Sequence, residues 1–140
     1  TEGRIINELI DNYVNSFTNN AVAFTSLGQT RYASALKYVD AVAGNSSSGI
    51  IETPAFKLPT VNIGDREKGR IRADNIIDCE PHLENIKVAL EKAFSQKFKK
   101  SLQNMKNPFR KSDTAMRILG VLKDYELPNN TKKYFYDLIY

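Results

Sequence analysis

A run of small polar residues, Gly-Asn-Ser-Ser-Ser-Gly at positions 44–49, has the composition of an anion-binding turn; it is called the serine turn below. It follows the apolar run 39–43 and precedes a segment predicted to be helical. In open α/β sheets, ligands bind beyond the carboxyl ends of the strands. Ser46 or Ser47 can cap the helix, and the backbone N–H groups that remain free at its start attract an anion. The serine turn therefore predicts a phosphate-binding site.

The serine turn also has a purely structural explanation, because serine is common at the start of a helix and most such turns bind nothing. It is not a Walker A loop, since no Gly-Lys-Ser/Thr follows it. Glu52, further along the predicted helix, has two interpretations. It is either a solvated carboxylate or an acceptor of hydrogen bonds from ribose hydroxyls, as in many nucleotide sites.

A second cluster of charge lies in residues 64–72, called the arginine loop below, which carry four basic and two acidic side chains. The loop follows the predicted strand 59–63, at the same edge of the sheet as the serine turn. Arg66 and Arg70 can hold phosphate oxygens with planar, charge-assisted hydrogen bonds. The alternative is a solvated hairpin whose internal ion pairs contribute little. Two such features on adjacent strand ends favour a shared anionic ligand.

The elements that must position these residues follow from hydrophobic periodicity and from Pro and Gly positions. Short, continuously apolar strands alternate with amphipathic helices, which predicts an α/β fold: a Rossmann-like parallel sheet with helices on both faces. Pro81 is expected in the first turn of a helix, where proline is tolerated. Helices are predicted at 5–17, 28–38, 46–56, 81–94, 95–104 and 112–124, strands at 21–24, 39–43, 59–63 and 74–78, and an aromatic-rich tail segment at 131–140.

Composition and charge exclude several classes of protein. The chain has 140 residues, enough for one domain, and lacks an apolar run that could span a bilayer. Its single Cys79 excludes an internal disulfide, and its single His82 cannot form a histidine-rich metal site. The net charge of +4 is small, and a solvated helix face explains the basic region 97–111 better than a nucleic-acid site does. The chain begins with Thr1, which we interpret as the start of a fragment.

Several of these segments resemble those of a known family. The runs at 27–28, 44–52, 59–66 and 68–70, together with Tyr32, closely resemble the hydrolysing UDP-N-acetylglucosamine 2-epimerases. The resemblance thins after about residue 107. It implies a GT-B fold, in which two Rossmann-like domains enclose the active site. Residues 1–140 would then form part of the C-terminal nucleotide-binding domain, with the N-terminal domain absent.

The resemblance implies a set of UDP-binding residues: Leu27, Tyr32, Ser46, Ser47, Ser48, Gly49, Glu52, Arg66 and Arg70. The first two serines of the turn would bind the diphosphate, helped by the backbone of the next two residues. Arg66 would face the diphosphate or the nucleotide, and Arg70 occupies a basic position of the same loop. Glu52 would hold the ribose hydroxyls. Tyr32 would stack on uracil and Leu27 would offer a backbone contact to the base, although a core aromatic is the alternative for Tyr32.

The implied reaction is elimination of UDP from UDP-N-acetylglucosamine, followed by addition of water to give N-acetylmannosamine. The acid and base groups that it needs would lie mainly in the absent part, so no residue of this chain is expected to be catalytic and the chain alone would be inactive. No metal or cofactor is implied. The expected setting is a cytoplasmic bacterial homo-oligomer that supplies sialic acid-like or capsule sugars.

Three alternatives stay open. The first is a hydrolysing epimerase of a UDP-diacetamido-trideoxy sugar on a route to legionaminic acid. The second is half of a GT-B glycosyltransferase. The third is a non-catalytic binding module. None of them calls for a nucleic-acid or membrane partner. In the full two-domain enzyme, the 131–140 tail is expected to pack across the cleft.

Overall fold

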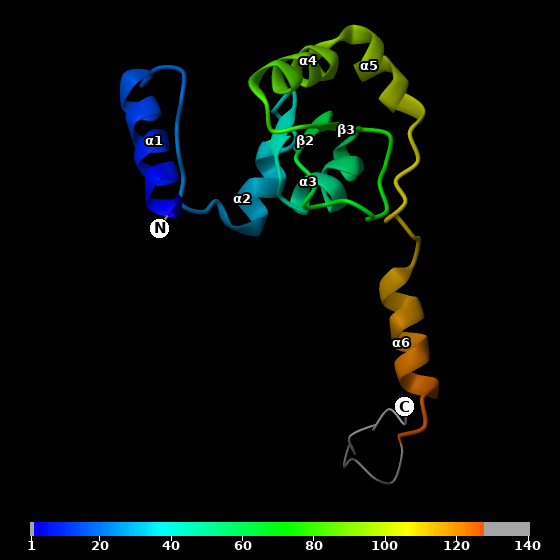
Figure 1. The fold of residues 1–140 in the computed structure, drawn as a ribbon. Helices are drawn as coiled ribbons and strands as arrows, with labels where there is room; N and C mark the ends of the chain where they lie inside the picture. The colour runs from blue at the N-terminus through cyan, green and yellow to red at the C-terminus, as the bar shows by residue number, and fades with distance from the viewer. Residues whose placement is uncertain (1, 128–140) are drawn as a thin grey trace, which may run out of the picture. The chain divides into compact units, whose positions relative to one another are not determined.

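The computed structural model describes residues 2–127, and the chain divides into two compact units, one through Asn107 and one from Pro108. The first unit contains α1 (Glu2–Ser16), α2 (Gly28–Ala35), β1 (Val42–Gly44), α3 (Ser48–Ile51), the 3-10 helix η1 (Thr53–Phe56), β2 (Thr60–Ile63), β3 (Ile76–Cys79), α4 (Leu83–Phe94), α5 (Gln96–Ser101) and the 3-10 helix η2 (Leu102–Asn104) (Figure 1). The second unit contains α6 (Thr114–Asp124).

The three strands form one parallel sheet in the order β1-β2-β3. Ala43 pairs with Val61, and Val61 pairs with Ile77, so the strands run in register through the middle of the sheet. Parallel strands need crossover connections, and here these are helical or loop segments of the kind that the alternating pattern predicts. The predicted α/β fold with a Rossmann-like parallel sheet is confirmed.

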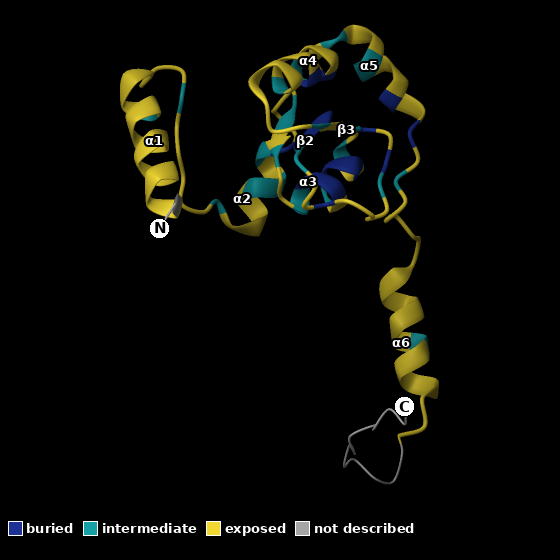
Figure 2. Ribbon diagram, in the orientation of Figure 1, coloured by how far each residue is buried: buried dark blue, intermediate teal, exposed yellow. Residues whose placement is uncertain are grey.

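Both faces of the sheet are covered, because successive strand residues point to opposite sides. Val61 and Ile77 pack against Ala89 and Ala93 of α4 and form the main core of the described residues. On the other face, α3 packs so closely on β2 that a Cβ added to Gly49 would lie 3.0 Å from the Thr60 side chain. Figure 1 shows α4 and α3 on opposite sides of the strands, and Figure 2 shows that the buried residues gather between them.

A buried polar network holds η1 to the sheet on the α3 face. The Thr60 hydroxyl lies 2.8 Å from the Thr53 hydroxyl, and the Asn75 amide donates to Thr53 at 2.9 Å and to the Leu58 carbonyl at 2.7 Å. All three polar side chains are at most 3% exposed. Buried polar groups stabilise a fold when they are paired and specify one arrangement of its parts. The network therefore fixes the segment that follows the serine turn.

The structure corrects three local predictions. Residues 21–24 do not form a strand, because no strand within 2–127 pairs with them. The helix predicted at 46–56 is divided into α3 and η1, since Pro54 cannot continue the α-helical hydrogen-bond pattern. Helix α4 begins at Leu83, so Pro81 precedes the helix and His82 is its N-cap residue. The predicted 131–140 segment lies outside the described residues.

The helices at the two ends of the described range are mostly exposed. Along α1, the apolar residues recur at the predicted helical spacing, yet Val14 is the one residue of 3–16 that is half-buried. Figure 2 accordingly shows α1 coloured almost entirely as exposed. Most residues of α6 are exposed as well. Within the basic region 97–111, Lys99 forms an ion pair with Asp40 at 2.7 Å. Among residues 2–127, no helix is long and apolar enough to cross a membrane, and no cluster of metal-ligating side chains is present.

Replacing Asn75 with alanine tests the buried network. We expect Asn75→Ala to lower the free energy of unfolding by about 2 kcal/mol in urea denaturation, because it removes the amide donor of the Leu58 carbonyl and the Thr53 hydroxyl. The Thr60 hydroxyl reaches both acceptors, but its one proton can serve only one of them. The matched control is Asn104→Ala at an exposed position, which should change the free energy by less than about 0.5 kcal/mol. Equal effects of the two substitutions would contradict the structural role of Asn75.

Candidate functional site

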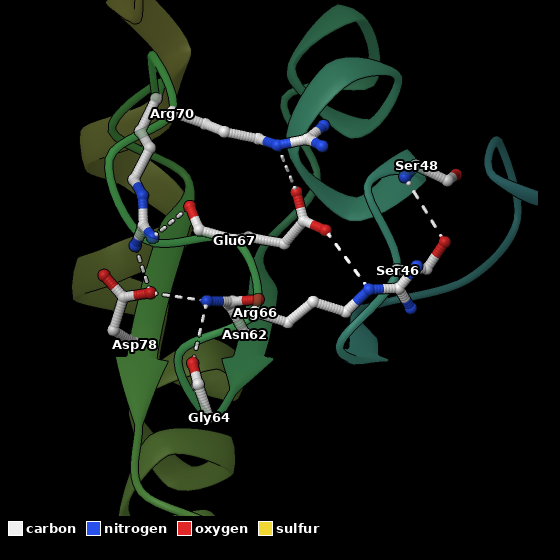
Figure 3. A network of polar contacts seen from close by, with 9 residues as sticks. Ser46, Ser48, Asn62, Gly64, Arg66, Glu67, Arg70 and Asp78 are labelled. Atoms are coloured by element: carbon white, nitrogen blue, oxygen red, sulfur yellow. Dashed lines mark hydrogen bonds and ion pairs between the residues drawn. The ribbon is translucent and has the colours of Figure 1, made fainter.

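The serine turn begins where β1 ends, and the pairing of Gly44 with Asn62 places it beside the end of β2. Ser47 is the N-cap residue of α3, but the capping bond comes from its neighbour: the Ser48 N–H donates to the Ser46 hydroxyl oxygen at 3.3 Å (Figure 3). The Gly49 N–H donates to the Ser46 carbonyl at 3.0 Å. The two expected backbone donors, Ser48 and Gly49, are therefore used to close the turn.

Other donors of the serine turn remain unused. In the part of the chain that the structure describes, the N–H groups of Ser46 and Ser47 and the Ser47 hydroxyl make no hydrogen bond. The Ser46 hydroxyl accepts a bond and still has its proton to donate. A small pocket of about 40 Å³ adjoins the turn and is lined by Tyr32, Ser46, Gly49 and Asn62 among others. The serine turn thus offers several unpaired donors at one strand end.

Tyr32 and Glu52 meet at Ser48. The Ser48 hydroxyl lies 2.6 Å from the Tyr32 hydroxyl and is hydrogen-bonded to Glu52 Oε2. All three residues are half-buried. Leu27 is half-buried too and is the N-cap residue of α2, the helix that carries Tyr32. Four of the expected nucleotide-binding positions are therefore connected through α2 and α3.

The arginine loop is organised around a buried carboxylate. The Glu67 side chain is 1% exposed, with its Oε2 3.0 Å from Arg70 Nε and its Oε1 3.8 Å from Arg66 Nε (Figure 3). The 3.8 Å contact is too long for a hydrogen bond, and the buried Oε2 has no hydrogen-bond partner among residues 2–127, so both contacts are ion pairs. The loop joins two parallel strands, so it is not a hairpin, and although its arginines are exposed its Glu67 is buried.

The two arginines remain available to a ligand. Arg66 and Arg70 are 67% and 53% exposed, and each contacts Glu67 through Nε. Within the described residues, the terminal NH₂ groups of both guanidinium groups have no partner. A planar guanidinium that is held by its Nε can still donate two hydrogen bonds to a phosphate. The loop thus presents cationic donors at the end of β2.

The far side of the arginine loop is tied to β3. Arg72 donates to the Glu67 carbonyl at 2.8 Å and forms an ion pair with Asp78, to which the Asn62 amide also donates at 2.7 Å. The Gly64 N–H continues the sheet by donating to the Cys79 carbonyl at 2.8 Å. Gly64 then turns the chain with φ +79°, a value that other residues rarely adopt. These contacts fix where the loop leaves the sheet.

The family described as UDP-N-acetylglucosamine 2-epimerase matches residues 1–123 of the chain. The chain belongs to this family. Its epimerase relatives include the GDP/UDP-N,N'-diacetylbacillosamine 2-epimerase (hydrolyzing) of Campylobacter jejuni subsp. jejuni serotype O:2, which is 43% identical over 137 residues. That alignment covers 97% of this chain and 35% of the relative.

Two further relatives are more distant. Polysialic acid biosynthesis protein P7 of Escherichia coli is 35% identical over 114 residues, which cover 81% of this chain and 29% of the relative. The UDP-N,N'-diacetylbacillosamine 2-epimerase (hydrolyzing) of Legionella pneumophila is 34% identical over 96 residues, which cover 69% of this chain and 25% of the relative. The chain therefore spans about a third or less of the length of these curated relatives of the epimerase family.

Within this chain, the structure brings most expected site residues to one edge of the sheet, on the serine turn, the arginine loop and the adjoining α2. Two residues that organise this edge were not expected from the sequence. They are Glu67, which pairs with both arginines, and Asn62, which joins the ends of β2 and β3 through Asp78. An acidic residue between closely spaced arginines was the available signal for Glu67.

Cys79 is the last residue of β3 and is half-buried. Burial raises the pKa of its thiol, and the neighbouring carboxylates of Asp78 and Glu80 raise it further. A raised pKa leaves less thiolate at neutral pH, and the thiolate is the nucleophile. These properties fit an unreactive strand-end cysteine.

Removing Arg70 tests the buried carboxylate. We expect Arg70→Ala to lower the free energy of unfolding by about 1–2 kcal/mol in urea, because Glu67 loses its nearest cation. The effect is smaller than for a fully buried pair, since Arg66 remains and Arg70 is half exposed. In a Glu67→Gln background the same substitution should have little effect. Lys87→Ala, which breaks an exposed pair with Glu84, is the control and should change the free energy by less than about 0.5 kcal/mol.

Alkylation tests the chemistry of Cys79. At pH 8 the thiol should react with iodoacetamide more slowly than glutathione does, because its raised pKa keeps it protonated. The rate should increase as the pH is raised further. Mass spectrometry of quenched samples gives the rate, and a rate at pH 8 equal to that of glutathione would contradict the expectation.

Proposed function

We propose that this chain forms the UDP-binding part of a hydrolysing UDP-sugar 2-epimerase. The observation that carries the proposal is the meeting of two donor sets at adjacent strand ends. The serine turn has unpaired N–H and hydroxyl donors, and the arginine loop holds two guanidinium groups with free terminal nitrogens. Their combination suits a diphosphate, which carries several negative oxygens. Membership of the epimerase family supports this ligand.

In the proposed complex, Ser46 and Ser47 donate to the diphosphate and Arg66 and Arg70 neutralise its charge. Helix α3 has only four residues, so its dipole is weak and the individual N–H groups supply most of the attraction. Glu52 accepts hydrogen bonds from the ribose hydroxyls.

The uracil ring would lie against α2. Tyr32 stacks on the ring and the backbone at Leu27 contacts its edge.

The chemistry of this part of the enzyme is stabilisation of a leaving group. In the elimination step, the bond between the sugar anomeric carbon and the UDP oxygen breaks, and the electron pair leaves with UDP. Negative charge develops on the UDP oxygen in the transition state of this step. Cationic donors that are already fixed beside that oxygen lower the activation barrier, because they need not reorganise during the reaction. Arg66 and Arg70 fit this role. Water then adds to the resulting 2-acetamidoglucal. The proton transfers are assigned to residues outside this chain, so the chain alone would be inactive.

The identity of the nucleotide sugar is the finer part of the proposal. UDP-N-acetylglucosamine is the substrate in the family description, and UDP-N,N'-diacetylbacillosamine appears in the names of two relatives. We place UDP-N,N'-diacetylbacillosamine first for testing, because its Campylobacter relative is 43% identical over nearly the whole chain. The expected setting is a cytoplasmic homo-oligomeric enzyme that supplies sialic acid-like or capsule sugars, in line with the polysialic acid relative. Residues 1–140 would belong to its C-terminal domain.

Calorimetric titration with UDP tests the nucleotide site in the protein as it is encoded, at its full length. We expect saturable binding that Ser46→Ala and Arg66→Ala each weaken about tenfold, the effect of losing a hydrogen bond to a charged group. Ser34→Ala and Lys87→Ala are matched controls outside the site and should leave the affinity unchanged. GDP is titrated in parallel, because the name of the Campylobacter relative includes both nucleotides.

Failure to bind UDP at millimolar concentration would overturn the proposed function. The same protein is then assayed for UDP release from each of the two candidate sugars. Transfer of the sugar to an acceptor, in place of hydrolysis, would favour a GT-B glycosyltransferase, and binding without UDP release would favour a binding module.

A further inference from the structure

A chain of three hydrogen-bonding side chains runs through the proposed nucleotide site. Tyr32 on α2 reaches the Ser48 hydroxyl at 2.6 Å, although the two residues are 16 positions apart. Ser48 is also hydrogen-bonded to Glu52 Oε2, four positions later. Residues at this spacing lie on the same face of a helix, so Ser48 and Glu52 are neighbours by construction. Tyr32 is brought to them by the tertiary fold alone.

The direction of these hydrogen bonds follows from the number of protons. A serine hydroxyl has one proton, so Ser48 cannot donate to both of its partners. A carboxylate can only accept, and therefore Ser48 donates to Glu52. Tyr32 must then donate its phenolic proton to Ser48. The result is a relay from Tyr32 through Ser48 to the Glu52 carboxylate, and each bond supports the polarity of the next.

The relay occupies one oxygen of Glu52 and leaves the other open. Oε1 has no partner among residues 2–127, and the side chain is half-buried and so accessible to a ligand. The backbone at this position is also fixed, because the Glu52 N–H donates to the Ser48 carbonyl at 3.0 Å and the next residue, Thr53, is part of the buried network. With the backbone fixed, only rotation of the Glu52 side chain remains, and the hydrogen bond from Ser48 restrains that rotation.

We propose that Ser48, oriented by Tyr32, is a positioning residue that holds the Glu52 carboxylate so that Oε1 accepts hydrogen bonds from the ribose hydroxyls. This inference rests on the proposed function, because it assigns Glu52 to the ribose of the nucleotide. It gives Ser48 a side-chain role in place of the expected backbone contact to the diphosphate, because the Ser48 N–H is already bonded to the Ser46 hydroxyl oxygen. It also gives the Tyr32 hydroxyl a role that a stacking ring does not need.

The test compares UDP with 2',3'-dideoxy-UDP, which lacks both ribose hydroxyls, by calorimetry on the full-length protein. The readout is the ratio of the two dissociation constants. We expect the unmodified protein to prefer UDP about tenfold or more. Ser48→Ala should lower this preference about fivefold, because it weakens the binding of UDP and leaves the affinity for the dideoxy analogue unchanged. Ser48→Thr keeps the hydroxyl and should restore the preference. Tyr32→Phe keeps the ring and removes the donor, and should lower the preference about twofold.

Two comparisons separate positioning from other effects. Ser34→Ala removes a hydroxyl that bonds only within its own helix α2, and it should leave the preference unchanged. Once Glu52 is replaced by alanine, Ser48→Ala should lower the preference no further, because the group that it positions is gone. A loss of affinity that is equal for UDP and the dideoxy analogue would indicate a merely structural role for Ser48 and would overturn the inference.

The outcomes also separate a failure of this inference from a failure of the proposed function on which it rests. If the unmodified protein prefers UDP and both Ser48→Ala and Tyr32→Phe retain that preference, the inference is wrong and the proposed function stands. If the unmodified protein binds UDP and the dideoxy analogue equally well, Glu52 does not bind the ribose hydroxyls and the inference is again wrong. If UDP does not bind at all, the proposed function fails and the inference fails with it. Should Ser48→Ala not fold, Tyr32→Phe decides.

Discussion

The parallel register of β1 on β2 is the constraint on which the rest of the site depends. It sets Gly44 opposite Asn62, so the chain leaves both strands at one edge of the sheet. The strands have only three and four residues, and few backbone hydrogen bonds hold them. A slip by one residue would move Thr60 to the α4 face and Val61 to the α3 face. The register is held because each face accepts only one of these side chains.

The two faces achieve this by different means. On one side, Val61 and Ile77 fit the small residues Ala89 and Ala93 of α4, so apolar contact specifies the register. On the other side, Thr60 belongs to the hydrogen-bonded network that also fixes η1. A polar network specifies a geometry more sharply than apolar contact does, because its members lose free energy when they are unpaired. The serine turn is anchored through its short helix to this polar face.

Several arginines in one short loop repel one another, and the buried Glu67 carboxylate compensates this repulsion. Like charges repel, and a loop with free arginines would present them in many orientations. A carboxylate that is 1% exposed must be paired, and it has two guanidinium groups within ion-pair distance. Both are held by Nε, which leaves their outer nitrogens for a ligand. The same buried charge therefore orders the loop and keeps it cationic at its surface.

How much of this was accessible from the sequence depends on the range of the interactions. The alternation of short apolar strands with amphipathic helices determined the parallel sheet, and the serine turn and arginine loop were predicted at strand ends, because these signals are local. Local signals failed at residues 21–24, where strand propensity had no partner, and at Pro54, where the helix could not continue. Tertiary structure alone decided that Glu67 is buried and that Tyr32 reaches Ser48. The contact between Tyr32 and Ser48 joins segments 16 positions apart, and the burial of Glu67 depends on the folded path of the whole arginine loop. Neither follows from local sequence, because the free energy of both arises only when the fold has formed and excluded water.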